Sequence, residues 1–146
     1  MINIDDFLAW EIKEKTRISD GSIILLQIGF SKYCPNKNKY LGTDERGEQT
    51  VQKLHFLGLL EEVAQWLVEQ RTINAIGIDT PSIDYGQSEY FKSHVILLNQ
   101  IIPSFKSLTN LDKLPNIGFG VIALPMKIQG GSLAPLRIVA IIPINN

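Results

Sequence analysis

The sequence predicts an α/β domain in which helices flank a mixed β-sheet. Segments with apolar side chains at helical spacing, such as 59–69, alternate along the chain with short and almost wholly apolar runs, such as 22–30. This alternation is typical of a sheet that is covered by helices. At 146 residues, with no internal repeat and no linker, the chain is long enough for one core. We therefore expect a single domain over residues 1–146.

Each element in the first third of the chain has a local signal. Asn3, followed by two acidic residues and an apolar periodicity, predicts a capped helix that ends near Thr16. The turn Asp20-Gly21 precedes the apolar run 22–30, which predicts a strand buried on both faces. Residues 31–53 are polar and contain proline and glycine, so they predict a long surface loop.

The remaining elements follow from periodicity and length. Residues 59–69 place leucine, valine and alanine on one side and mainly glutamate on the other, which is the clearest helical pattern in the chain. The apolar run 74–79 predicts a second strand, and a further helix is expected over about 88–99. Three more strands are expected at 101–105, 119–128 and 136–143.

Composition argues against several functional classes. The formal net charge is −1, so the chain lacks the positive footprint expected of proteins that bind nucleic acid or an anionic membrane. The apolar runs are shorter than the roughly 20 residues that span a bilayer, and the N-terminus lacks the pattern of a secretory signal. We therefore expect a cytoplasmic protein with no nucleic-acid or membrane partner. The single cysteine, Cys34, permits no intrachain disulfide, and its polar turn gives no sign of an activated thiol.

The segment Gly77–Gly86, which reads GIDTPSIDYG, is the strongest candidate for chemistry. Its polar side chains Asp79, Ser82 and Asp84 follow an apolar strand, and α/β folds build their sites at strand ends. These residues could line a substrate pocket, but we favour a structural reading in which Asp79 and Ser82 satisfy backbone groups of the turn. A Ser-His-Asp triad of Ser82, His94 and Asp79 lacks the sequence context of a nucleophile elbow.

Several stretches together resemble one known family. They are Ala75–Gly86 (AIGIDTPSIDYG), His94–Leu98 (HVILL), Leu108–Pro115 (LTNLDKLP) and Ala123–Gly131 (ALPMKIQGG), which runs on to Pro135–Ile141 (PLRIVAI). With these motifs the chain resembles the cyclase-like family of metal-dependent hydrolases, which includes bacterial kynurenine formamidases and isatin hydrolases. The resemblance implies the swivelling β/β/α fold. It also implies that the chain corresponds to the later part of the family domain, so we expect the fold to be incomplete at its N-terminus.

The resemblance implies a reaction and a metal. Family members hydrolyse an amide or formamide C–N bond, as in N-formylkynurenine, with a water activated by Zn²⁺ or Mn²⁺. The family's main ligand motif, His-x-Gly-Thr-His-x-Asp-x-Pro, is absent from this sequence. His94 matches a later ligand of the family, but Lys106 stands where the family has glutamate. A lysine ammonium has no lone pair and repels a cation, so we expect His94 to be a former ligand and no metal to bind.

Three functional hypotheses remain open from the sequence. The chain is a hydrolase of a small-molecule substrate that takes missing ligands from an upstream segment, or a non-catalytic relative that binds a protein or small molecule, or a truncated remnant. Lys106 favours the second and third, as does Leu133, which replaces a family glycine and would be strained at positive φ. The other histidine, His55, is interpreted as structural. A sheet without its usual neighbours has an open edge, so we expect a homo-oligomer.

Overall fold

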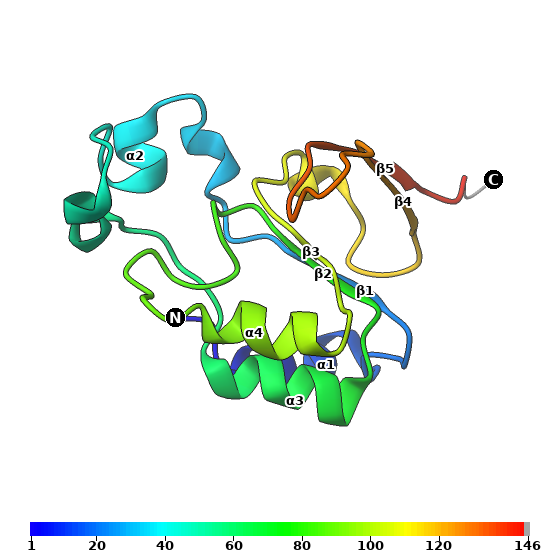
Figure 1. Ribbon diagram of the computed structural model, residues 1–146. Helices are drawn as coiled ribbons and strands as arrows, with labels where there is room; N and C mark the ends of the chain where they lie inside the picture. Colours follow the sequence, from blue (N-terminus) through cyan, green and yellow to red (C-terminus); the bar gives the residue numbers. More distant parts are fainter. Residues whose placement is uncertain (145–146) are drawn as a thin grey trace. The chain divides into compact units, whose positions relative to one another are not determined.

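The computed structural model describes residues 1–144 and divides the chain into two compact units, 1–111 and 112–146 (Figure 1). Helices and strands alternate through the first unit, so the α/β class is confirmed. The prediction of one domain stays a prediction. Within the described residues, no helix is long and apolar enough to cross a bilayer.

The first unit holds a three-stranded parallel sheet with the order β1-β2-β3. Figure 1 shows the three longer helices along one side of this sheet. These six elements are α1 (Ile4–Glu14), β1 (Ile23–Leu26), α3 (Glu61–Arg71), β2 (Ala75–Ile78), α4 (Lys92–Asn99) and β3 (Ser104–Phe105). The central strand β2 is buried along its whole length, whereas no residue of β1 is fully buried. The prediction that this strand is buried on both faces is therefore wrong, because among the described residues β1 pairs only with β2, at the edge of the sheet.

The core lies between the sheet and the helices, as the periodicity predicts. Val63, Ala64 and Leu67 of α3 are fully buried and pack in one cluster with β2 and with Leu97 of α4. Helix α1 begins with a capping box, in which the Asn3 side chain accepts a hydrogen bond from the Asp6 N–H and the Asp6 side chain accepts one from the Asn3 N–H. The predicted cap is thus confirmed.

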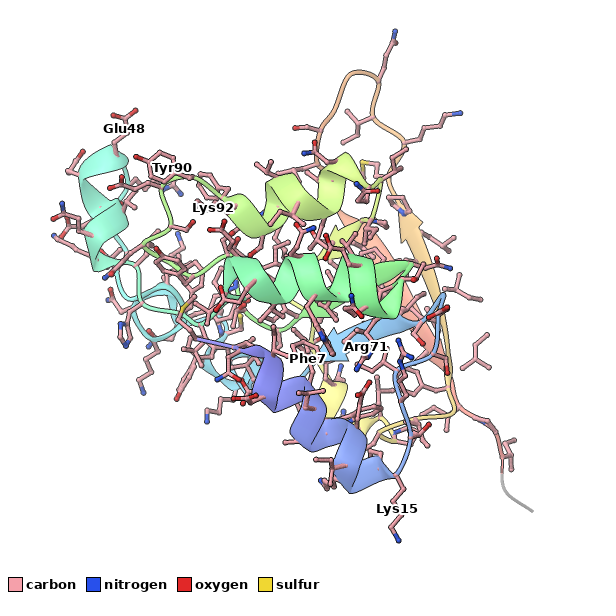
Figure 2. All side chains as sticks on the ribbon, turned by 90° about the horizontal axis from the view of Figure 1, so that it is seen from below. Phe7, Lys15, Glu48, Arg71, Tyr90 and Lys92 are labelled. Carbon is pink, nitrogen blue, oxygen red and sulfur yellow. The ribbon has the colours of Figure 1, made fainter. Side chains whose placement is uncertain are left out.

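A buried ion pair joins α1 to α3. Arg71 Nε and Nη2 donate to the two carboxylate oxygens of Glu11 at 2.8 and 2.9 Å, and the guanidinium lies 4.1 Å from the centre of the Trp66 ring. Figure 2 shows Arg71 at the end of α3, near Phe7 of α1. The bond with Arg71 holds the pKa of Glu11 below its ordinary value despite the burial of the carboxyl group. The two helices are therefore fixed to each other by a bidentate contact.

Residues 31–53, which the sequence predicts to be a long surface loop, contain short helical elements. They contain a 3₁₀ turn at Ser31–Tyr33, the short helix α2 (Lys37–Leu41) and a second 3₁₀ turn at Glu48–Lys53. Asn36 caps α2 by accepting a hydrogen bond from the Lys39 N–H at 3.1 Å, and Gly42 ends it with a φ of 98°. Both residues are ordinary helix-boundary signals, but the helix between them is too short for its periodicity to be recognised.

The second unit contains one antiparallel pair, β4 (Gly120–Pro125) and β5 (Leu136–Ile141). Both strands are confirmed, although each is shorter than predicted. The described strands thus form two separate sheets and not one mixed sheet. In the connection between β4 and β5, positive φ falls on Gly130 and not on Leu133. Leu133 is therefore not strained, and this sequence argument for a relaxed site does not hold.

Candidate functional site

The carboxyl ends of the three parallel strands bring distant polar segments together. The Asp79 N–H donates to the Leu26 carbonyl at 3.3 Å, which joins the ends of β1 and β2. On the other side, the Ser107 N–H donates to the Thr80 carbonyl at 2.9 Å, which places the residues after β3 beside those after β2. This is the edge at which open parallel sheets bind ligands. The sequence segment 79–84 therefore lies at a position suited to a site.

Asp79 fastens the segment that follows β1. Its side chain is buried, and its two oxygens accept hydrogen bonds from the N–H groups of Ile28 at 2.9 Å and Gly29 at 2.8 Å. The Ser31 N–H adds a longer bond of 3.4 Å, and the Tyr40 hydroxyl donates to the Asp79 carbonyl at 3.1 Å. Burial raises the pKa of the Tyr40 hydroxyl. The Asp79 carboxylate accepts hydrogen bonds from backbone N–H groups, as the structural interpretation predicts. These N–H groups belong to the segment after β1 and not to the turn that follows Asp79 itself.

Asp84 holds the start of α4. Its side chain is buried and accepts hydrogen bonds from the backbone N–H groups of Ser93 at 2.9 Å and His94 at 3.3 Å. The N-cap residue Phe91 has a φ of 47° and provides no side-chain cap of its own. Asp84 thus caps the helix from nine and ten residues upstream of the two N–H groups and places a negative charge at the helix's positive end.

Asp84 also orients the imidazole of His94. The Oδ2 atom of Asp84 accepts a hydrogen bond from His94 Nδ1. Burial raises the pKa of the Asp84 carboxyl, but its bonds with the His94 ring and with the Ser93 N–H outweigh this effect and leave the pKa below its ordinary value. The carboxylate is therefore ionised at neutral pH and fixes the tautomer that carries a proton on Nδ1. Nε2 remains as the nitrogen that can accept a proton or coordinate a metal.

The Ser-His-Asp triad that the sequence argues against, Ser82 with His94 and Asp79, does not form among the described residues. The partner of His94 is Asp84, and the Ser82 hydroxyl oxygen accepts a hydrogen bond from the Asp84 N–H at 3.3 Å. The Thr80 hydroxyl donates to the Ser82 carbonyl at 2.8 Å. Ser82 therefore shapes the turn between Asp79 and Asp84. A role of Asp79, Ser82 or Asp84 in substrate binding stays a prediction.

Gly58 contributes to the site in a way that sequence reasoning missed. A Cβ atom at this position would lie 2.3 Å from the backbone carbon of Asp84 and 2.3 Å from the Tyr85 nitrogen. Only glycine permits this close approach, which lets the Leu59 N–H donate to the Ile83 carbonyl at 2.7 Å. The segment before α3 therefore supports the backbone that carries Asp84. The Leu-His-Phe-Leu-Gly run at 54–58 contained the glycine, but nothing in the sequence identified its neighbour.

The side chains of residues 1–144 do not by themselves form a site for a divalent metal. A catalytic zinc ion takes about three protein ligands, but residues 1–144 contain no group of three or more His, Cys, Asp or Glu side chains that could hold one. His55 is exposed and donates its N–H to the Leu41 carbonyl. Lys106 directly follows β3, and its ammonium group has no lone pair to offer a metal. His94 is thus the one oriented imidazole in the described part of the chain.

Comparison with known proteins places this geometry in context. A family model described as "Putative cyclase" matches residues 1–85, more than half of the chain. Isatin hydrolase from Roseibium aggregatum is 28% identical over 147 residues, which cover 98% of this chain and 53% of that protein. Kynurenine formamidase from Polaromonas naphthalenivorans is 37% identical over 71 residues, 49% of this chain and 31% of that protein.

Solved structures show the same relationship. Isatin hydrolase A from Ralstonia solanacearum matches with a TM-score of 0.85 and 29% identity over 97% of this chain and 53% of its own. Isatin hydrolase A from Labrenzia aggregata, solved with benzyl benzoate, matches with a TM-score of 0.83 at 29% identity over the same shares of the two chains. A potential metal-dependent hydrolase with cyclase activity shares the fold at 21% identity and a TM-score of 0.68. The chain spans about half the length of the isatin hydrolases that it matches.

Proposed function

Because the chain belongs to the cyclase family, we propose that it takes part in the hydrolysis of a C–N bond in a cyclic amide or a formamide. Isatin hydrolase and kynurenine formamidase are both similar to this chain, and their names refer to a cyclic amide and to a formamide. We also propose that its fold is the swivelling β/β/α arrangement, with part of it supplied from outside these residues. The TM-scores of 0.83 and 0.85 with isatin hydrolases support this proposal.

The observation that carries the proposed function is the Asp84–His94 pair. A buried carboxylate that fixes one imidazole nitrogen and leaves the other available is the arrangement of a histidine that acts on a ligand, a proton or a metal. The pair lies after the β2 strand end, where α/β folds bind substrates.

The described residues lack groups that the hydrolysis of an amide requires. Hydrolysis of an amide needs a strongly activated water and a group that stabilises the developing oxyanion. The described residues provide one oriented histidine and no metal-ligand group of three. We therefore propose that the chain is inactive alone and that a segment equivalent to the unmatched part of the isatin hydrolases supplies the remaining groups.

A second candidate function is that of a non-catalytic relative that binds a small molecule or a protein. Lys106 favours this candidate, because it places an ammonium group directly after β3, at the edge of the sheet that carries Asp79 and Thr80. A cation at this edge suits an anionic ligand better than a divalent metal.

Co-expression distinguishes the two candidates. The chain is produced alone and together with the part of the Roseibium isatin hydrolase that it does not span, and the hydrolysis of isatin and N-formylkynurenine is followed with added Mn²⁺ or Zn²⁺. We expect turnover only from the pair, lost in His94→Ala and kept in the matched control His55→Ala. A complex that forms without turnover favours the non-catalytic function. Turnover by the chain alone contradicts the proposal that the chain is inactive by itself.

A further inference from the structure

Phe91, the residue immediately before α4, has an unusual backbone conformation. Its φ of 47° lies in the left-handed region, which bulky side chains rarely adopt. Lys15 and Thr72 also have positive φ, but they follow the ends of α1 and α3, where a left-handed residue is common. A residue that precedes the start of a helix is normally extended. The conformation of Phe91 is therefore strained and needs contacts that maintain it.

Two hydrogen bonds hold the backbone of Phe91. Its N–H donates to the Oγ atom of the buried Ser88 at 3.2 Å, and its carbonyl accepts a hydrogen bond from the Val95 N–H at 3.0 Å. The Ser88 N–H in turn donates to the Tyr85 carbonyl at 3.0 Å. The turn that leads from the 79–86 segment into α4 is therefore fixed by side-chain and backbone bonds together.

The side chain of Phe91 contacts the imidazole of His94. The two ring centres are 6.3 Å apart and the ring planes meet at 83°, which is the edge-to-face arrangement that aromatic rings prefer. Figure 2 shows Tyr90 and Lys92, the residues on either side of Phe91, at the start of α4. Phe91 is not a member of the hydrophobic cluster between the sheet and the helices. Burial in that core therefore does not account for the strain, whereas the contact with His94 coincides with it.

Asp84 and Phe91 restrain the imidazole of His94 in different ways. The bond between Asp84 Oδ2 and Nδ1 holds one atom of the ring and sets the tautomer. The last torsion of a histidine side chain is broad, so one hydrogen bond leaves rotation of the ring soft. A second ring that meets the imidazole at a steep angle opposes this rotation. The two contacts together define the direction in which Nε2 points.

We propose that Phe91 is a positioning residue for His94. The strained turn from Ser88 to Phe91 holds an aromatic ring against the imidazole, and this ring, together with Asp84, fixes the direction of Nε2. The use of the fixed imidazole in hydrolysis rests on the proposed function. The orientation itself does not, because it can be measured in the chain without turnover.

The exchange of the His94 Nδ1 proton with water tests the proposal. In the intact, metal-free chain, nuclear magnetic resonance detects this proton when its bond with Asp84 opens rarely. We expect Phe91→Ala and Phe91→Gly to raise the exchange rate about tenfold or more. Phe91→Tyr keeps the ring and is expected to change the rate less than about threefold, as is the matched control Tyr90→Ala at the preceding exposed position.

The glycine variant separates the ring from the backbone. Glycine adopts a φ of 47° without strain, so a role confined to the backbone predicts slow exchange in Phe91→Gly and fast exchange in Phe91→Ala. Positioning by the ring predicts fast exchange in both. The Ile76 N–H, which donates to the Pro103 carbonyl at the centre of the sheet, reports whether each variant remains folded.

Three results overturn the proposal: no protected Nδ1 proton in the unmodified chain, an unchanged exchange rate in Phe91→Ala or Phe91→Gly, or equal acceleration in Phe91→Tyr and Phe91→Ala. The proposed function fails separately. If the co-expressed pair shows no turnover while the Phe91 variants behave as expected, the positioning role is supported and only the hydrolytic function is contradicted. Turnover by the pair with an unchanged exchange rate in Phe91→Ala contradicts only the positioning role.

Discussion

The candidate site depends on Asp84 and Asp79. Each carboxylate contacts a segment that its position in the sequence does not identify. Both were recognisable as strand-end carboxylates, but their partners were not. Asp84 binds backbone and ring groups at the start of α4, nine and ten residues away. Asp79 binds N–H groups on the segment after β1, about fifty residues away. Local patterns report turns and caps within a few residues. Contacts that depend on the sheet pairing of β1 with β2 cannot be obtained from them.

Replacement of Asp84 tests whether this carboxylate organises the start of α4. Asp84→Asn keeps the shape of the side chain, but its amide group presents a donor to N–H groups that also donate. We expect a loss of about 1–3 kcal/mol in the free energy of unfolding, measured by urea denaturation. Asp44→Asn, at an exposed position, is the control and is expected to change the free energy by less than about 0.5 kcal/mol. An equal effect of the two substitutions contradicts the capping role.

The lowered pKa values of Asp84 and Glu11 predict how stability depends on pH. Both carboxyl groups hold their protons less tightly in the folded state than in the unfolded state. The stabilisation from their ionised forms is therefore fully present above about pH 5 and is lost as pH falls through the folded pKa values, below about pH 4. We expect Asp84→Asn and Glu11→Gln each to flatten the decline in unfolding free energy between pH 5 and pH 2, relative to the unmodified chain (window estimated from ordinary carboxyl values). An unchanged slope in both variants argues against the hydrogen bonds of Asp84 and the ion pair of Glu11 with Arg71 described above.

At the scale of the element, the sequence was most informative where a pattern repeats over several turns. Helices α1 and α3 have apolar periodicity over eleven residues each, and their existence was predicted correctly. The helix α2 has five residues, too few for a period to be recognised. The burial of β1 was overestimated, because an apolar run predicts a strand but not whether that strand lies at the centre or the edge of its sheet.

The contact between α1 and α3 gives a prediction at this scale. Arg71→Ala removes the bidentate partner of Glu11 and leaves a carboxylate whose side chain is only 12% exposed. We expect a loss of about 3–5 kcal/mol in the free energy of unfolding, because the buried charge left behind loses its ion-pair partner and keeps only the hydrogen bond from the Ile18 N–H. Lys53→Ala breaks the exposed pair with Glu45 and serves as the matched control, with an expected loss of less than about 1 kcal/mol. Comparable losses from both variants contradict a buried, coupled pair.

The close approach of Gly58 to Asp84 gives a second prediction about elements. Gly58→Ala forces the segment before α3 away from the backbone at Asp84 and Tyr85, since the added Cβ would lie 2.3 Å from each. We expect a loss of about 2 kcal/mol or more in the free energy of unfolding and a shift in the nuclear magnetic resonance signals of the His94 ring. Gly120→Ala, where a Cβ meets no atom within 4 Å, is the control. An unshifted His94 ring in Gly58→Ala means that the segment does not support the Asp84–His94 pair.

At the scale of the whole molecule, the chain keeps the fold of its relatives over half of their length. The motifs at 75–86, 94–98, 108–115 and 123–141 together indicate the family from the sequence, and the match of the family model to residues 1–85 confirms it. The division into two units was not predictable from the sequence, because it depends on which strands pair with one another. The two histidines and Lys106 could be read directly from the sequence, and the structure adds that His94 is held in a fixed orientation.

The central claim is that these residues orient one histidine but do not assemble a metal site. The most direct measurement is the metal content of the purified chain after equilibration with Zn²⁺ or Mn²⁺ and removal of free ions, for the unmodified protein, His94→Ala and His55→Ala. We predict much less than one metal ion per chain in all three. One tightly bound ion per chain that is lost in His94→Ala and kept in His55→Ala contradicts the claim.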